Sequence, residues 1–108
     1  MTDDMTAAAS VAILLHRELD DDYVGLWTLP WHIRRALPEA GDSQVRKIAA
    51  AVLEALLAGG AAIGSLDETT GTFAPWETQG AVESVMSAWR GLGRDPNIGE
   101  VAWIARAS

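Results

Sequence analysis

The sequence predicts an α+β fold, with three N-terminal helices, a β-hairpin, one further helix and a C-terminal strand. Apolar residues recur at helical spacing in several segments, whereas residues 61–76 form two short apolar runs around turn residues. The chain of 108 residues is long enough to bury one core but not two. We therefore expect a disordered N-terminus over residues 1–5 and a single domain over residues 6–108.

The first helix is expected over about residues 7–19, with Thr6 as its cap. Its shared apolar face would be formed by Ala8, Val11, Ala12, Leu15 and Leu19. The run Asp20–Asp22 ends this helix, and its carboxylates favour the positive end of a second helix that begins near Tyr23.

Pro30 interrupts the second helical segment, because proline lacks the N–H of a helical hydrogen bond. We expect a kink or a restart at this point, with Thr28 as the cap and Pro30 in the first turn. The second helix ends at Pro38. The residues expected to point inward are Leu26, Trp27, Ile33 and Leu37.

The strongest helical pattern runs from Ser43 to Gly60. Its apolar residues repeat every three or four positions and so share one face: Val45, Ile48, Val52, Leu53, Leu56 and Leu57. Asp42 or Ser43 can cap the start, and the two glycines at the end can close the helix in a left-handed conformation. Because this face must be buried, we expect this segment to be the central helix.

The periodicity changes after the central helix. Residues 61–66 and 72–76 are short apolar runs separated by turn residues, which predicts a hairpin. A last helix is expected over about residues 79–91, with an apolar face formed by Val82, Val85, Met86, Trp89 and Leu92. Residues 101–105 are predicted to form a strand that joins the hairpin as its third member.

The chain carries two resemblances, one in the order of its elements and one in particular stretches of its sequence. The succession of helix, helix, central helix and hairpin over residues 7–76 is similar to a winged helix, in which the third helix contacts DNA and the hairpin is the wing. The chain between Tyr23 and Trp103 also resembles a group of small actinobacterial proteins with no assigned activity. The matching stretches are Tyr23-Val-Gly-Leu-Trp27, Val45-Arg46, Leu56-Leu57, Phe73-Ala-Pro-Trp76 and Leu92 to Trp103. These resemblances imply a winged-helix-like topology and carry over no functional residue.

The formal net charge of −7 is concentrated near the N-terminus, where residues 1–22 hold six acids against Arg17. Such a charge repels phosphate backbones and favours basic partners. The chain has no cysteine, which excludes disulfides and thiolate chemistry. Asp3 and Asp4 stand where a signal peptide needs positive charge, and the apolar run 11–15 is too short to cross a membrane. We expect a cytoplasmic protein that does not associate with membranes.

The preferred hypothesis is a non-catalytic protein-binding module, for example an acidic immunity protein or antitoxin that neutralises a basic toxin domain. The net charge and the acidic run after the first helix favour a basic partner. Trp31 and Trp76 each follow a proline, and indoles at the edge of an element are frequent interface anchors. The predicted protein-binding residues are Asp20, Asp21, Asp22, Trp31 and Trp76.

The alternative hypothesis is a winged-helix transcription regulator that dimerises through its first helix. Gln44, Arg46 and Lys47 lie at the N-terminal end of the predicted central helix, where a reading helix would meet base edges or phosphate. The rest of the exposed face is mostly alanine, and Asp67–Glu68 at the hairpin tip would repel phosphate. We therefore expect a protein partner of unknown identity, with nucleic acid disfavoured by charge and a homodimer left open.

Catalysis and metal binding find little support in the sequence. His16 and His32 are the only imidazoles, and neither has a serine nucleophile motif at a recognisable spacing. A calcium loop that began at Asp20 would need an acid at position 31, where a tryptophan stands. Zinc would need several His or Cys ligands that the chain lacks. We expect no enzyme activity, no catalytic residue, no cofactor and no metal.

Overall fold

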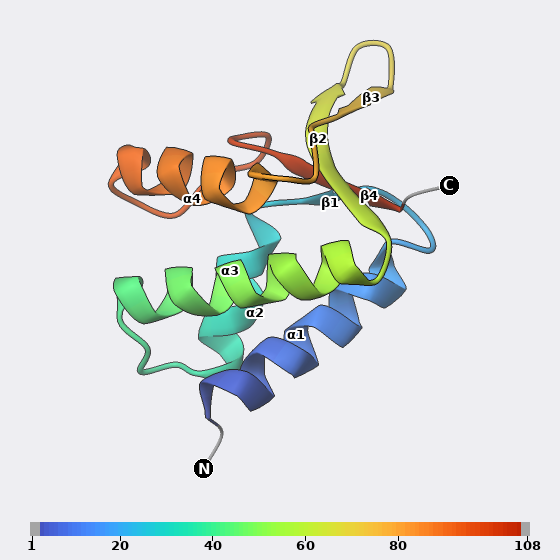
Figure 1. Ribbon diagram of the computed structural model, residues 1–108. Helices are drawn as coiled ribbons and strands as arrows, with labels where there is room; N and C mark the ends of the chain where they lie inside the picture. The colour runs from blue at the N-terminus through green and yellow to red at the C-terminus, as the bar shows by residue number, and fades with distance from the viewer. Residues whose placement is uncertain (1–2, 107–108) are drawn as a thin grey trace.

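The computed structural model describes residues 3–106 and confirms an α+β architecture, with four helices and one four-stranded antiparallel sheet in that range (Figure 1). The elements in chain order are α1 (Asp4–Glu18), β1 (Val24–Gly25), α2 (Thr28–Ala36), α3 (Asp42–Ala58), β2 (Ala61–Asp67), β3 (Thr72–Pro75), α4 (Ala81–Leu92) and β4 (Trp103–Arg106). The strand order is β1-β4-β2-β3, so the C-terminal strand lies between the first strand and the hairpin.

Helix α1 begins at Asp4, three residues before the predicted start, and Asp3 replaces Thr6 as its cap. The Asp3 Oδ1 atom accepts a hydrogen bond of 2.8 Å from the Thr6 backbone N–H, which satisfies one of the free donors at the helix start. Of the N-terminus predicted to be disordered, residues 1–2 lie outside the described residues. Asp3 forms the cap, and Asp4 with Met5 forms the first turn.

The prediction of a second helix beginning near Tyr23 was wrong. Val24 and Gly25 instead form strand β1, which pairs with Ile104 and Trp103 of β4. The restart near Pro30 is confirmed, because α2 begins at Thr28 and holds the proline in its first turn. Thr28 is not the cap, since its hydroxyl donates to the Gly25 carbonyl at 2.8 Å.

Helix α3 is central, as predicted, because it packs against α1, α2, α4 and β2. Its buried residues include all the predicted apolar positions except Leu57, which is partly buried: Val45, Ile48, Ala49, Val52, Leu53 and Leu56. Neither Asp42 nor Ser43 is the cap, since both lie inside the helix and Gly41 precedes it. Gly60 adopts φ 99° and turns the chain into β2.

The predicted hairpin and its third strand are both present. Strands β2 and β3 pair with Leu66 opposite Phe73, and β4 lies on the other side of β2 with Ile63 opposite Ile104. Asp67 closes the turn by accepting the Thr69 backbone N–H at 2.9 Å. The last helix and the last strand each begin two residues after their predicted starts.

One face of the sheet is covered by the helices. Because side chains alternate along a strand, Val24, Ile63 and Ile104 all point toward the helices. They belong to a single hydrophobic core that also contains buried residues from all four helices. Trp89 of α4 is fully buried in this core, as its place on an apolar helical face predicts. The alternate residues of the strands therefore point to the opposite side of the sheet, away from the core.

Candidate functional site

On the outer face of the sheet, four neighbouring strand positions carry only glycine or alanine, and we call them the floor of this face. Gly25 and Gly64 lie on opposite sides of Trp103 in the strand register, and Ala62 lies two residues before Gly64 on β2. Extending the same register places Ala105 beside Tyr23 at the start of β1. Because these four floor residues carry at most a methyl group, large side chains can lie flat against the strands.

Four aromatic side chains lie on this floor. The Trp27 and Trp103 rings meet edge to face, with centroids 4.9 Å apart and an interplanar angle of 87°. The Tyr23 and Phe73 rings are stacked, with centroids 5.7 Å apart and an angle of 16°. A Cβ atom at Gly25 would collide with the Trp27 ring, and one at Gly64 would collide with the Phe73 ring. We call Tyr23, Trp27, Phe73 and Trp103 the aromatic face.

The aromatic face is partly open to solvent. Tyr23 is 39% exposed, and the other three rings are half-buried. Aromatic side chains usually fill a core, so four rings gathered on one open sheet face form an unusual apolar surface. The expectation that Trp27 points into the helical core was wrong, because Gly25 leaves room for its ring on the outer side. Trp103 likewise lies on the outer face and is only half-buried.

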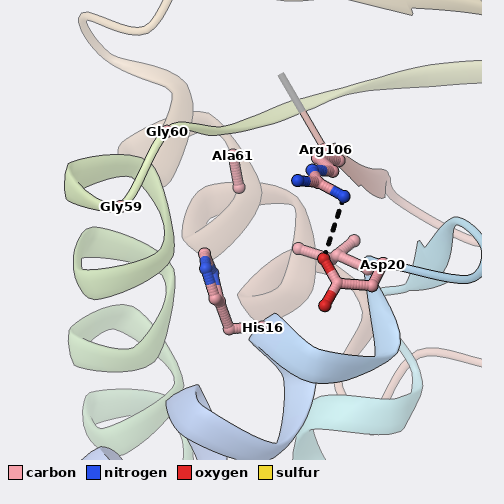
Figure 2. Close-up of a pocket in the computed structure, with 7 residues that line it drawn as sticks. His16, Asp20, Gly59, Gly60, Ala61 and Arg106 are labelled. Atoms are coloured by element: carbon pink, nitrogen blue, oxygen red, sulfur yellow. Dashed lines mark ion pairs between the residues drawn. The ribbon is translucent and has the colours of Figure 1, made fainter. Parts of the chain in front are cut away.

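Acidic residues border the aromatic face at two ends. Asp20–Asp22 directly precede Tyr23, and Asp67 with Glu68 form the hairpin tip beyond Phe73. Asp20 is paired with Arg106 at 3.0 Å, as Figure 2 shows beside a polar cavity of about 230 Å³ that His16 also lines. The side chain of Asp22 accepts the Tyr23 backbone N–H at 2.7 Å.

Arg94, in the loop between α4 and β4, is also paired with an acid. Arg94 forms two hydrogen bonds to the Glu100 carboxylate, one of them 2.9 Å from Nη2 to Oε2. These bonds and the Asn97 backbone N–H lower the pKa of Glu100 to about 2. Within residues 3–106, Asp21 and Glu68 form no ion pair, so the border keeps a net negative charge.

The predicted protein-binding residues do not share one surface. Asp20, Asp21 and Asp22 lie at the edge of the aromatic face, but Trp31 is 56% exposed on α2, which packs on the core side of the sheet. There the Arg35 guanidinium lies 4.6 Å from the Trp31 ring centroid. Trp76 is half-buried against the core, and its indole N–H donates to Ser65 Oγ at 3.0 Å.

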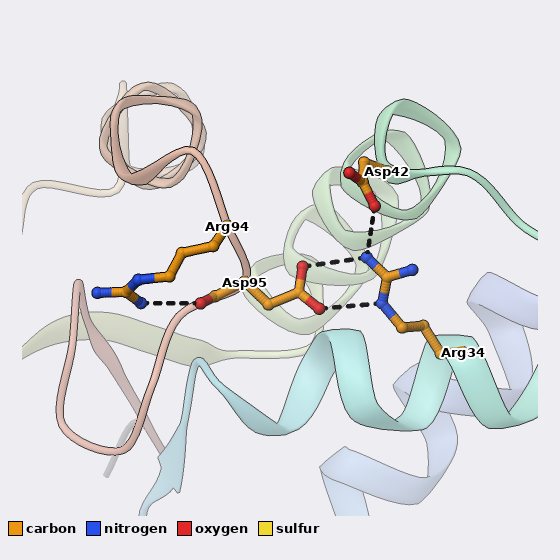
Figure 3. A network of polar contacts seen from close by, with 4 residues as sticks. All are labelled: Arg34, Asp42, Arg94 and Asp95. Carbon is orange, nitrogen blue, oxygen red and sulfur yellow. Dashed lines mark hydrogen bonds and ion pairs between the residues drawn. The ribbon is translucent and has the colours of Figure 1, made fainter.

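The predicted DNA-binding residues are partly engaged with acids. Gln44 donates to Asp4 Oδ1 at 2.7 Å, whereas Arg46 is half-buried and Lys47 is exposed. Arg34, the nearest cation on α2, donates to Asp42 at 3.0 Å and to Asp95 at 2.9 Å (Figure 3). These bonds raise the pKa of Arg34, and the two carboxylates offset its positive charge, whereas Arg46 and Lys47 form no ion pair within residues 3–106.

His32 of α2 lies beside an acid of α1. His32 lies 3.8 Å from Glu18, and burial lowers the pKa of this histidine although the carboxylate opposes the shift. Among residues 3–106, no group of three or more acids and histidines is placed to hold a metal ion. No helix in the described part of the chain is long and apolar enough to span a membrane.

The aromatic face was missed by the sequence reasoning, although two signals for it exist. Tyr23, Gly25 and Trp27 alternate with Val24 and Leu26, which is a strand pattern rather than a helical one. A glycine within an apolar strand pattern, as at position 64, also marks a place where another group approaches closely. The chain matches no protein-family model, and comparison with curated proteins and with solved structures finds no significant similarity.

Proposed function

We propose that this protein is a non-catalytic protein-binding module that binds a basic segment of a protein partner on its aromatic face. The observation that carries this proposal is the gathering of four aromatic rings on one open sheet face with acids at both ends. Aromatic residues are enriched at protein interfaces because they bury a large area at a low cost in conformational entropy. The rings stay partly open to solvent and are therefore available to a partner.

The chemistry of the face favours arginine and lysine side chains in the partner. A guanidinium can lie over the Tyr23 or Trp27 ring, since the face of an aromatic ring attracts cations. The carboxylates of Asp21 and Asp22 stand beside Tyr23 and add Coulomb attraction. The aliphatic parts of the same side chains can pack on Phe73 and Trp103. Aromatic rings and acids thus select the same kind of partner.

The class of module that we propose is an acidic immunity protein or antitoxin acting on a basic toxin domain. Complementary charge accelerates association with such a partner and opposes binding to acidic ones. The order of α1, β1, α2, α3, β2 and β3 supports a winged-helix-like topology, to which α4 and β4 are added. Domains of one topology serve many different functions, so the site and not the fold supports the proposal.

Binding can be measured by fluorescence polarisation with a labelled peptide that alternates arginine and leucine. A matched peptide with glutamate in place of arginine is the control for charge. We expect binding of the basic peptide only, and Tyr23→Ser should weaken it about tenfold, as for an interface anchor. Trp31→Ser removes an exposed aromatic side chain from α2 instead, so it should leave the affinity unchanged. Equal effects of the two substitutions would contradict the aromatic face as the binding site.

The acidic border can be tested separately with the same basic peptide. Asp21→Lys should weaken binding at low salt, and the effect should shrink as the salt concentration rises. Glu39→Lys is the matched control, because Glu39 is an exposed acid in the loop between α2 and α3. If both reversals weakened binding equally, the peptide would be responding to net charge rather than to the border of the aromatic face.

The alternative function is a DNA-binding regulator that uses α3. Only Lys47 of its three predicted residues is exposed without a hydrogen bond in the described structure. A gel shift at low salt with the upstream region of its own gene tests this alternative. We expect no shift, because the charge of −7 repels phosphate. A shift that disappears in an Arg46→Ala, Lys47→Ala double variant would favour the regulator over the protein-binding module.

A further inference from the structure

The sheet ends in two edge strands, β1 and β3, because the strand order is β1-β4-β2-β3. An edge strand turns every second backbone N–H and C=O group away from the sheet, where another strand can pair with it. Such pairing produces dimers or aggregates, or it adds a peptide of a partner to the sheet. The way in which each edge is closed therefore decides by which route this sheet can bind another chain.

The edge of β1 is closed by side chains of its own segment. The backbone groups of Tyr23 and Gly25 face outward, because the neighbouring Leu26 N–H donates to a carbonyl just before β4 at 3.1 Å. The outward N–H of Tyr23 donates to Asp22 Oδ1 at 2.7 Å. The outward carbonyl of Gly25 accepts the Thr28 hydroxyl at 2.8 Å. Both residues of β1 are also buried, so this edge offers little to an added strand.

The edge of β3 is more open, since three of the four residues of this strand are exposed and the hairpin projects away from the helices in Figure 1. Trp76 donates its backbone N–H to the Ile63 carbonyl of β2 at 2.8 Å, which fixes the alternation along β3. Phe73 and Pro75 are then the residues whose backbone groups face outward. Because proline has no N–H, Phe73 carries the one outward donor of β3.

We propose that Pro75 keeps the edge of β3 from pairing with another strand, and that the basic partner segment therefore lies on the aromatic face instead of extending the sheet. The second part of this proposal rests on the proposed function. At position 75 the ring carbon Cδ takes the place of the amide hydrogen and stands where an added strand would bring its carbonyl oxygen. Proline in a sheet is confined to such sites, with its nitrogen toward solvent.

The effect is largest when the added strand is β3 of a second copy. In the antiparallel register that places position 73 of one copy opposite position 75 of the other, each pair of residues would exchange both N–H···O bonds if no proline were present. Proline removes one bond from each pair, and two-fold symmetry repeats the loss, so half of these bonds are missing. The edge of β3 is thus a poor template for its own copy as well as for a partner.

Sedimentation equilibrium over a range of protein concentrations tests the first part. Pro75→Thr restores the N–H at an exposed position and adds a residue that favours strands. Its average mass should rise toward that of a dimer at a concentration at least about tenfold lower than for the wild-type protein, because the missing backbone bonds can form. Pro75→Ala, which restores the N–H without a β-branched side chain, should shift the mass in the same direction.

Ala74→Thr is the matched control, because it places the same side chain at an exposed position of β3 and restores no N–H. Its average mass should follow that of the wild-type protein at every concentration. Equal masses for the wild-type protein and Pro75→Thr at every concentration would overturn the role of Pro75. Equal association of Ala74→Thr and Pro75→Thr would overturn it too, since strand propensity and not the missing N–H would then be the cause.

Fluorescence polarisation with the basic arginine–leucine peptide tests the second part. Pro75→Thr should leave the affinity unchanged at protein concentrations below its self-association, because the peptide lies on the aromatic face. Tighter binding by Pro75→Thr would show that the peptide adds a strand to β3, and it would contradict this part. A peptide that bound neither protein would overturn the proposed function together with the second part, whereas sedimentation would still decide the first.

Discussion

Gly25 and Gly64 decide how closely the aromatic rings approach the sheet. A side chain at either position would occupy the volume that the Trp27 or Phe73 ring now fills. Glycine normally weakens a strand, because it adds no packing of its own and loses much conformational freedom on folding. At these two positions that cost is offset by the rings that lie directly over the backbone. The function proposed for the face therefore depends on residues that have no side chain.

Replacing Gly64 by alanine should destabilise the protein by about 1–3 kcal/mol, because the added Cβ would overpack this part of the sheet. The new methyl group would meet the Ala74 carbonyl oxygen and the Phe73 ring. Gly91→Ala is the matched control, since that position lies inside α4 with open space around it. It should stabilise the protein by about 0.5–1 kcal/mol through helix propensity. Urea unfolding of both variants gives the comparison, and equal changes would argue against close packing at Gly64.

The elements show which parts of the fold follow from local sequence. Helices α1, α3 and α4 and the hairpin were predicted because each carries its own periodicity and its own turn or end signals. Strand β1 was missed because its two residues pair with β4, which lies almost eighty residues later in the chain. The aromatic face depends on that same long-range pairing, so its rings could be recognised in the sequence but not placed together.

Polar contacts of Glu100 hold the loop between α4 and β4 together, and we call these contacts the charged clasp. This carboxylate accepts from the Arg94 guanidinium and from the Asn97 backbone N–H, and these bonds lower its pKa from 4.5 to about 2. A carboxylate whose folded pKa is depressed stabilises the protein above its unfolded pKa, and it loses that effect as the pH falls through the folded pKa. The clasp therefore stabilises the loop at neutral pH and weakens between about pH 4.5 and pH 2.

Glu100→Gln should lower stability at neutral pH and make little difference near pH 2, where the wild-type carboxyl group is partly protonated and most of its stabilising effect is lost. Thermal unfolding of both proteins across this pH range gives the difference in melting temperature. That difference should shrink steeply between about pH 4.5 and pH 2. Glu39→Gln, at an exposed acid outside the clasp, is the control. A difference that stayed constant down to pH 2 would show that the clasp acts through something other than charge.

At the scale of the whole molecule, the sheet separates two kinds of surface. Its inner side closes a core formed by all four helices, whereas its outer side leaves aromatic rings open between acidic ends. The composition predicted an acidic protein with a basic partner. The position of the acids relative to the rings could be determined only from the pairing register of the strands. The predicted pair of anchors, Trp31 and Trp76, lies elsewhere, so the surface that we propose rests on other aromatic residues.

The most direct test of the proposed function uses the five tryptophans as reporters in one NMR titration. The indole N–H resonances are followed while the basic arginine–leucine peptide is added to the intact protein. We predict that the signals of Trp27 and Trp103 shift, because these rings lie on the aromatic face. The signals of Trp31, Trp76 and Trp89 should stay in place. Shifts confined to Trp31, or no indole shift at a concentration that saturates binding, would contradict the aromatic face as the site of partner binding.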